Sequence, residues 1–188
     1  MSLVAILDAN VLYPASIRDV LLSVAQSGLI QPHWTAYIHD EWSRRFLEKN
    51  PHVDPEKISA TIDLMNTEFP GALVEDYEHW ERLLELPDPD DKHVLAAAIE
   101  VDAEFIVTFN LADFPEDQLD TYAVKAISPD DILCDVLQMD APTMLRALKK
   151  HRARLRNPPK TAEEYIDSLD NSGLRVFASM LRDHTDLI

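Results

Sequence analysis

Short apolar runs alternate with stretches of helical spacing over the first 135 residues of the chain. The runs at residues 3–7 and 105–108 are short and almost entirely apolar, which is typical of buried strands. Residues 122–127 form a third candidate strand, and weaker strand signals occur at Ile30 and at residues 72–74. Strands that alternate with helices predict a parallel sheet covered by helices on both faces, and therefore an α/β fold.

Capping residues and helix breakers show where the predicted helices begin and end. Ser, Thr, Asp or Pro stands at several starts, and Gly or Pro follows most of the ends. The predicted helices of this part of the chain lie at about residues 14–27, 35–49, 54–69, 77–86 and 90–102, with one more from residue 129 onward.

The last part of the chain shows only helical patterns. Residues 144–155 predict a basic amphipathic helix, residues 161–164 fit a capping box, and apolar positions support a last helix at 174–181. So few residues cannot build a large core alone. We therefore predict an α/β domain at residues 1–135, followed by a helical C-terminal extension at residues 136–188.

Composition excludes several classes of protein. Three glycines are too few for a dinucleotide-binding G-x-G-x-x-G motif or a phosphate-binding loop, and the single Cys134 excludes an internal disulfide and a cysteine-based zinc cluster. No apolar run approaches the roughly 18 residues of a membrane span. The first residues lack the pattern of a signal peptide. We expect a soluble, cytoplasmic protein with no membrane partner.

The net charge of −17 is unevenly distributed. Residues 1–140 carry 28 acidic residues against 8 Lys and Arg, whereas residues 141–188 carry 9 Lys and Arg against 6 acidic residues. Residues 141–160 contain seven basic residues and no acidic one. Such asymmetry indicates an acidic body with a basic arm that could bind nucleic acid, a partner or the body itself.

Three carboxylates are crowded just before the Ala-rich helix. Asp88, Asp90 and Asp91 fall within four positions, next to Pro87 and Pro89. A single Asp would suffice to cap the helix. Three together repel one another unless a cation lies among them. Capping and cation binding are both consistent with this stretch taken alone.

Other carboxylates fall where an open parallel sheet binds its ligands, outside the carboxyl ends of the strands. Asp8 follows the first strand, Asp113 lies in the loop after the strand at 105–108, and Glu41 lies on the helix after Thr35. If the stretch at residues 88–91 joins these three residues, four carboxylates meet without matching Lys or Arg. Such a cluster implies a hard divalent cation, and Mg²⁺ or Mn²⁺ fits oxygen ligands better than Zn²⁺ does. Such an ion activates water and neutralises the charge of a phosphodiester.

Two asparagines are candidate supporting residues of this site. Asn10 and Asn110 each follow a strand end by a few residues, so they could orient metal ligands or the scissile phosphate.

The order of these motifs resembles a known family. The motifs are Leu7-Asp8-Ala9-Asn10, then Glu41, then Asp91 before His93-Val94-Leu95-Ala96-Ala97-Ala98, then Thr108-Phe109-Asn110-Leu111-Ala112-Asp113. They resemble the successive motifs of PIN-domain ribonucleases over residues 1–135, and VapC-type toxins of bacterial toxin–antitoxin pairs are the most similar subgroup. The C-terminal helices resemble the extension of some larger VapC-like proteins.

This resemblance implies a three-layer α/β/α sandwich and Mg²⁺- or Mn²⁺-dependent cleavage of RNA. By position it implies metal ligation by Asp8, Asp91 and Asp113, with Glu41 assisting. It also implies a cognate antitoxin, which would insert an Arg or Lys or an apolar helix at the acidic site. A homodimer is a further expectation from the family.

Some assignments stay open at this point. Asp88, Asp90 and Asp91 compete for one motif position, and spacing favours Asp91, with Asp90 as a second ligand. Asp40 could face inward instead of Glu41, since the periodicity of their helix fits either residue.

The basic segment 141–160 also has more than one explanation. As an RNA-binding arm it would supply phosphate contacts through Arg152, Arg154 and Arg156. Its basic face could equally be only solvated, or could dock on the acidic body of the chain itself.

Two other functions compete with the ribonuclease. A complete site could belong to an RNA- or protein-binding module that does not cleave. An Asp after the first strand also begins the motif of haloacid-dehalogenase-like phosphohydrolases, although Asn10 stands where that family has a second Asp.

Overall fold

The computed structural model describes residues 2–188, which form two compact units. The sheet unit comprises residues 3–13 and 31–127. The helical unit comprises Ser2 with residues 14–30 and 128–188.

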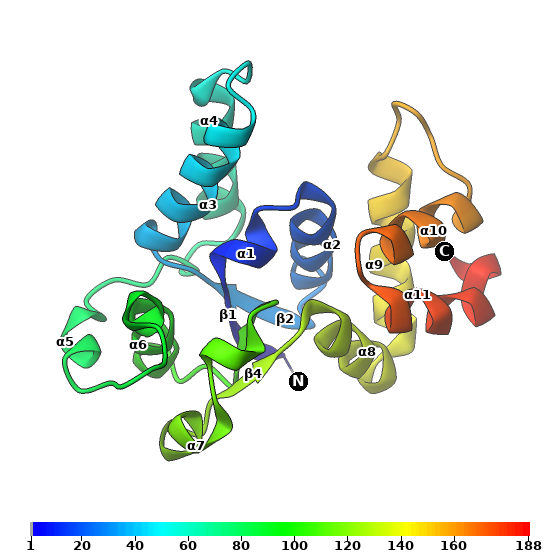
Figure 1. Ribbon diagram of the computed structural model, residues 1–188. Helices are drawn as coiled ribbons and strands as arrows, with labels where there is room; N and C mark the ends of the chain where they lie inside the picture. Colours follow the sequence, from blue (N-terminus) through cyan, green and yellow to red (C-terminus); the bar gives the residue numbers. More distant parts are fainter. Residues whose placement is uncertain (1) are drawn as a thin grey trace. The chain divides into compact units, whose positions relative to one another are not determined.

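A four-stranded sheet forms the centre of the sheet unit (Figure 1). Its strands are β1 (Leu3–Leu7), β2 (Ile30–His33), β3 (Phe105–Val107) and β4 (Lys125–Ile127), in the order β2-β1-β3-β4. Strand β3 pairs in parallel with both β1 and β4, so that Ile106 lies between Ile6 and Ala126. The predicted α/β fold class, with a short parallel sheet and C-terminal helices, is confirmed.

Helices of the sheet unit begin where the sequence supplies caps. Thr35 accepts a hydrogen bond from the Ile38 backbone N–H, and Asp54 accepts one from that of Glu56. Helix α6 packs against β1 and β3. The helices of this unit are α1 (Ala9–Leu12), α3 (Ala36–Lys49), α4 (Pro55–Glu68), α5 (Glu78–Glu81), α6 (Lys92–Glu100) and α7 (Glu116–Leu119), with 3₁₀ turns η1 (Pro89–Asp91), η2 (Leu111–Asp113) and η3 (Asp120–Tyr122).

Three predicted elements are shorter in the structure than in the sequence pattern. Residues 72–74 make only an isolated bridge, between Leu73 and Trp34. Strand β4 begins at Lys125 because the turn η3 and the left-handed Ala123, with a φ of 56°, come before it. The helix predicted near residues 77–86 is reduced to the single turn α5.

Five helices and a 3₁₀ segment make up the helical unit. They are α2 (Ala15–Ala25), α8 (Pro129–Met139), α9 (Ala141–Arg154), α10 (Ala162–Asn171), α11 (Arg175–Leu181) and η4 (Arg182–Leu187). The predicted capping box is present, because Thr161 and Glu164 each bond the other's backbone N–H. Helix α9 packs on α2, and α11 packs on α8 and α10. The boundary predicted after residue 135 stays a prediction.

No helix within residues 2–188 combines the length and the apolar composition that crossing a bilayer requires.

One carboxylate links two helices of the helical unit. Asp130, on α8, accepts hydrogen bonds from the backbone N–H groups of Val176 and Phe177 at the start of α11, at 3.0 and 2.9 Å. We expect Asp130→Ala to lower the free energy of unfolding by about 1–2 kcal/mol, the usual effect of losing such a cap. Urea denaturation measures this. The control is Asp135→Ala, an exposed residue of the same helix, and an equal loss in both variants would contradict the prediction.

Candidate active site

The candidate site lies in the sheet unit, at the carboxyl ends of β1 and β3. These strands are parallel neighbours, so their ends reach the same edge of the sheet. Asp8 directly follows β1, and its backbone N–H donates to the Val107 carbonyl oxygen at 3.1 Å. Asp8 is also the N-cap residue of α1, although its side chain makes no capping hydrogen bond. The fold therefore fixes its carboxylate at the sheet edge.

A hydrogen-bond network orients the Asp8 carboxylate. Its Oδ2 atom accepts from Asn10 Nδ2 at 2.6 Å and from Thr108 Oγ1 at 2.7 Å. Asn10 Nδ2 also donates to Thr108 Oγ1 at 2.8 Å, and Asn10 Oδ1 accepts from the Phe109 backbone N–H at 3.0 Å. The network ties the residues after β1 to those after β3. It places the Asn10 side chain against the Asp8 carboxylate, and the supporting role of Asn10 in a metal site stays a prediction.

Thr108 is the residue of this network that sequence reasoning missed. It is fully buried, donates its hydroxyl to Asp8, and accepts from the backbone N–H of Asn110 at 3.0 Å. The signal was weak, because a Thr at a strand end is common and its partner lies 100 residues away. For Asn110, the bond to Thr108 comes from its backbone, and its side chain is exposed.

The Asp8 carboxylate lies in an unfavourable environment for a negative charge. Only 6% of the residue is exposed, and this burial raises the pKa of Asp8, while the hydrogen bond from Thr108 opposes the rise. The negative charge of Glu41 raises the pKa further. Asp8 is therefore a buried acid whose ionised form needs a positive neighbour.

Asp91 is electrostatically coupled to the other predicted ligands. It ends the turn η1 and precedes α6, and it is half-buried. Burial raises the pKa of Asp91 to about 6, and the negative charges of Asp8, Asp113 and Asp88 add to the rise. Residues far apart in the sequence are thus close enough here to repel one another. We call Asp8, Glu41, Asp91 and Asp113 the acidic cluster.

The neighbours of Asp91 are placed differently. Asp88 and Asp90 are both exposed, and the Asp88 carboxylate accepts a hydrogen bond from the Asp90 backbone N–H at 2.9 Å. This is the capping role that the sequence offered as one explanation of the stretch. Burial and charge coupling favour Asp91 as the ligand. The supporting role of Asp90 stays a prediction.

Glu41 faces the site, whereas Asp40 is exposed. The Glu41 Oε2 atom lies 3.3 Å from Nε2 of His93, a buried residue of α6. The His93 ring also contacts the ring of Tyr37, with centroids 4.4 Å apart. Glu41 thus lies beside His93, and its charge is close enough to Asp8 to contribute to the raised pKa of that carboxyl.

The donor set fits a hard divalent cation. Among residues 2–188, no three His, Cys, Asp or Glu side chains lie close enough together to hold a metal ion as they stand. The acidic cluster nevertheless offers only carboxylate oxygens, and burial, together with the charges of neighbouring carboxylates, raises the pKa of Asp8 and of Asp91. A hard divalent cation, which prefers oxygen ligands, would relieve that repulsion.

The three arginines predicted to contact RNA have different surroundings in the helical unit. Arg152 is half-buried, and its guanidinium donates to the backbone carbonyl oxygens of Lys160 and Ile188 at 2.8 and 3.1 Å. Arg154 Nη1 donates to Gln26 Oε1 at 2.9 Å, and Arg156 is exposed. Both terminal nitrogens of the Arg152 guanidinium are therefore bonded within the fold.

Comparisons with known proteins agree with the motif order. A PIN domain family model matches residues 4–112, and a model described as "VapC50 C-terminal domain" matches residues 129–183. The "Putative ribonuclease VapC50" of Mycobacterium tuberculosis is 40% identical to this chain over 79 residues, which are 42% of this chain and 47% of that protein. The matched segment thus spans about half the length of that relative. No solved structure matches the chain.

Proposed function

The chain belongs to the PIN domain family, and from this premise we propose that it is a metal-dependent endoribonuclease that cleaves RNA phosphodiester bonds. The name of the 40% identical relative, "Putative ribonuclease VapC50", supports the choice of reaction. The PIN domain model matches residues 4–112, which include Asp8. This match favours ribonuclease activity over the activity of a haloacid-dehalogenase-like phosphohydrolase. In addition, Asn10 is an amide bonded to Asp8 and offers no acid.

The observation that carries the proposal is the coupling of Asp91 to Asp8 and Asp113. These carboxylates come from three separate parts of the chain. Burial raises the pKa of Asp91 to about 6, and the negative charges of Asp8 and Asp113 add to the rise. A fold gains no stability from carboxylates that repel one another at a half-buried position. Their proximity is explained if the site takes up a divalent cation.

In this proposal Asp8, Asp91 and Asp113 hold Mg²⁺ or Mn²⁺. The ion supplies charge neutralisation at the phosphodiester and lowers the pKa of a water molecule. Asn10 and Thr108 both donate hydrogen bonds to Oδ2 of Asp8, and in this way they hold the carboxylate in one orientation. Glu41, which lies beside His93, assists from α3 as a carboxylate whose charge reaches Asp8.

We further propose that the protein is the toxin of a toxin–antitoxin pair in the cytoplasm. The match of the second family model to residues 129–183, described by the VapC50 name, supports a VapC-type chain with a C-terminal extension. The partner would be a cognate antitoxin that covers the acidic cluster with an Arg or Lys, or with an apolar helix. The homodimer expected from the resemblance stays a prediction.

The first test is cleavage of a mixed RNA pool by the full chain, with Mg²⁺, with Mn²⁺ and with a chelator. We expect cleavage only with metal, and a rate at least about a hundredfold lower for Asp91→Asn, because a metal ligand matters at least as much as its hydrogen-bond partners. The matched control is Asp63→Asn, which removes the same charge from an exposed position of α4. Gel electrophoresis of labelled RNA gives the rates.

The outcomes separate the proposal from its alternatives. Cleavage that persists in the chelator, or an Asp91→Asn rate equal to that of Asp63→Asn, would refute a metal-dependent site in the acidic cluster. RNA binding without any cleavage would favour a binding module instead.

A further inference from the structure

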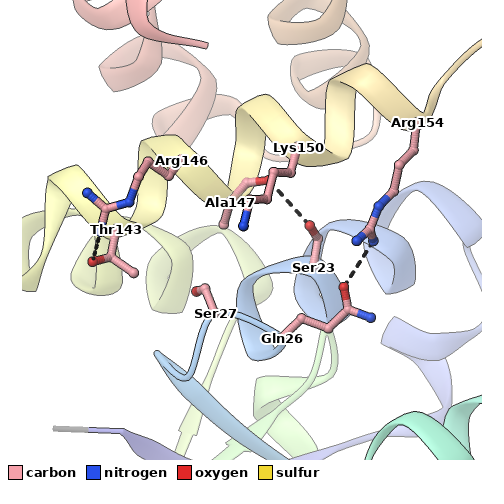
Figure 2. Close-up of a pocket in the computed structure, with 8 residues that line it drawn as sticks. All are labelled: Ser23, Gln26, Ser27, Thr143, Arg146, Ala147, Lys150 and Arg154. Atoms are coloured by element: carbon pink, nitrogen blue, oxygen red, sulfur yellow. Dashed lines mark hydrogen bonds between the residues drawn. The ribbon is translucent and has the colours of Figure 1, made fainter.

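A polar pocket of about 330 Å³ lies between α2 and α9, entirely within the helical unit. Figure 2 shows Arg146, Lys150 and Arg154 on α9 at this pocket, with Ser23, Gln26 and Ser27 contributed by α2 and the turn after it. The two helices are joined at its floor, where Ser23 Oγ donates to the Ala147 carbonyl oxygen at 3.4 Å. The pocket is thus a built feature of two packed helices. It is distinct from the acidic cluster, which lies in the sheet unit.

The three cations of the pocket follow a regular spacing. Arg146, Lys150 and Arg154 are four residues apart, so they share one face of α9 and succeed one another by about 6 Å along the helix. All three side chains are exposed. Arg146 Nη2 donates to Thr143 Oγ1 at 2.8 Å, and Arg154 donates to Gln26. These bonds hold both guanidinium groups along the pocket.

An acidic residue near the pocket is Asp140, the N-cap of α9, whose pKa is lowered by hydrogen bonds from Thr143 and also by the charge of Arg146. In the part of the chain that the structure describes, none of the ion pairs involves Arg146, Lys150 or Arg154. Like charges at successive helix turns repel one another, and an anion between them removes that repulsion. A polyanion with regularly spaced charges matches the row of cations.

We propose that this pocket binds phosphate groups of the RNA backbone. The inference rests on the proposed ribonuclease function, because it takes RNA as the substrate. Side chains of Arg, Lys, Ser, Thr and Gln are those that contact phosphates in protein–nucleic acid complexes, and they line this pocket. Ala147 is the one apolar residue of the lining, so the pocket lacks the apolar anchor on which a protein partner would dock.

The charge of the sheet unit explains why such a site is needed. The sheet unit contains 23 Asp and Glu against 7 Lys and Arg, so its field repels a polyanion. Most of the affinity of a protein for nucleic acid comes from neutralising phosphates. The helical unit carries the row of cations that can supply this affinity.

The pocket changes which basic residues are expected to bind RNA. Arg154 is retained, whereas Arg152 is bonded to backbone carbonyl oxygens and Arg156 does not line the pocket. Arg146 and Lys150 replace them. The sequence spacing alone could not choose between these faces of the helix.

The test measures RNA binding without cleavage. Full-length protein is titrated into a labelled single-stranded RNA in a chelator, and fluorescence anisotropy gives the affinity at several KCl concentrations. The variant is Arg146→Gln with Lys150→Gln. The control is Lys149→Gln with Arg175→Gln, which removes two exposed positive charges of the same unit outside the pocket.

We expect the pocket variant to bind RNA about tenfold more weakly, and its salt slope to fall by about 1.4, the value for two lost contacts to single-stranded phosphates. The affinity of the control variant for RNA should fall no more than about twofold, because exposed charges outside the pocket contribute little. Equal losses in both variants, or no loss in either, would overturn the proposal. Both variants change only exposed side chains, so they should fold as the wild type does.

Two competitors distinguish RNA from other anions. Inorganic phosphate should displace the labelled RNA no better than chloride of equal ionic strength, and poly-glutamate should compete less well than unlabelled RNA. If either competes as well as RNA does, the pocket is a site for small anions or acidic proteins, and the RNA proposal fails. The two proposals can fail separately. A wild type that binds RNA but does not cleave it refutes only the ribonuclease proposal. A wild type that cleaves RNA, together with a pocket variant that binds RNA as well as the wild type does, refutes only the pocket proposal.

Discussion

Asp8→Asn should lower the rate of RNA cleavage by about a thousandfold or more, because losing only a hydrogen-bond partner of a metal ligand already costs about 10- to 100-fold. Asn has nearly the shape of Asp, and its amide oxygen can accept the bonds from Asn10 and Thr108. The neutral amide removes one negative charge from the acidic cluster. Single-turnover cleavage of labelled RNA in Mn²⁺ or Mg²⁺ measures the rate, with Asp63→Asn as the control.

The same substitution should raise stability in the absence of metal. Burial raises the pKa of Asp8, so the folded protein binds this proton more tightly than the unfolded chain does. The wild type therefore loses stability as the pH rises from below the usual Asp pKa through the raised value, whereas the amide of the variant does not titrate. We expect Asp8→Asn to be more stable than the wild type at about pH 8, and this difference to shrink toward about pH 4.

Urea denaturation at both pH values, in a chelator, tests this expectation. A variant that cleaves RNA at the wild-type rate would remove Asp8 from the site. A variant that is less stable than the wild type at the higher pH would show that the hydrogen bonds to the carboxylate outweigh its burial. We expect Asp8→Asn to lose activity and to gain stability, because the buried Asp8 carboxylate serves function at the cost of stability.

The sequence predicted the parts of the site that depend on strand ends. Asp8 and Asp113 could be placed because each follows an apolar strand, and parallel neighbours bring their ends together. Asp91 could be favoured over Asp88 only by motif spacing. The structure adds a physical difference, because Asp91 is half-buried and Asp88 is exposed and caps η1. Capping and burial depend on the fold, so a run of acidic residues in the sequence does not show which residue caps and which is buried.

Residues that act through tertiary partners were harder to predict. Thr108 is joined to Asp8 by a bond between residues 100 positions apart, which no local pattern indicates. Arg152 belongs to a basic run, yet its guanidinium is bonded to the carbonyl oxygens of Lys160 and Ile188. Sequence gives the charge of a residue, while the fold decides whether that charge is available to a ligand. The pocket beside Lys150 is formed by the packing of α2 on α9, which the sequence does not indicate.

Binding of Mn²⁺ should weaken about tenfold between about pH 7 and about pH 5, because the metal binds the ionised carboxylate and Asp91 must lose its proton first. The pKa of Asp91 is raised to about 6 by burial and by the charges of Asp8, Asp113 and Asp88. An Asp with the ordinary value of 3.8 would stay ionised over that range, so an unperturbed site would bind equally well at both pH values.

Isothermal titration calorimetry with Mn²⁺ measures this dependence without RNA or catalysis. Asp91→Asn should bind Mn²⁺ more weakly and with a smaller change in affinity over the same range, because one titrating ligand is gone and Asp8, whose pKa burial also raises, remains. Asp90→Asn tests the second carboxylate of the stretch: if Asp91 is the ligand, this variant keeps the tenfold dependence. A wild-type affinity that does not change with pH would mean that the repulsion among Asp8, Asp91 and Asp113 is not what the metal relieves, and the acidic cluster would lose its physical link to the proposed reaction.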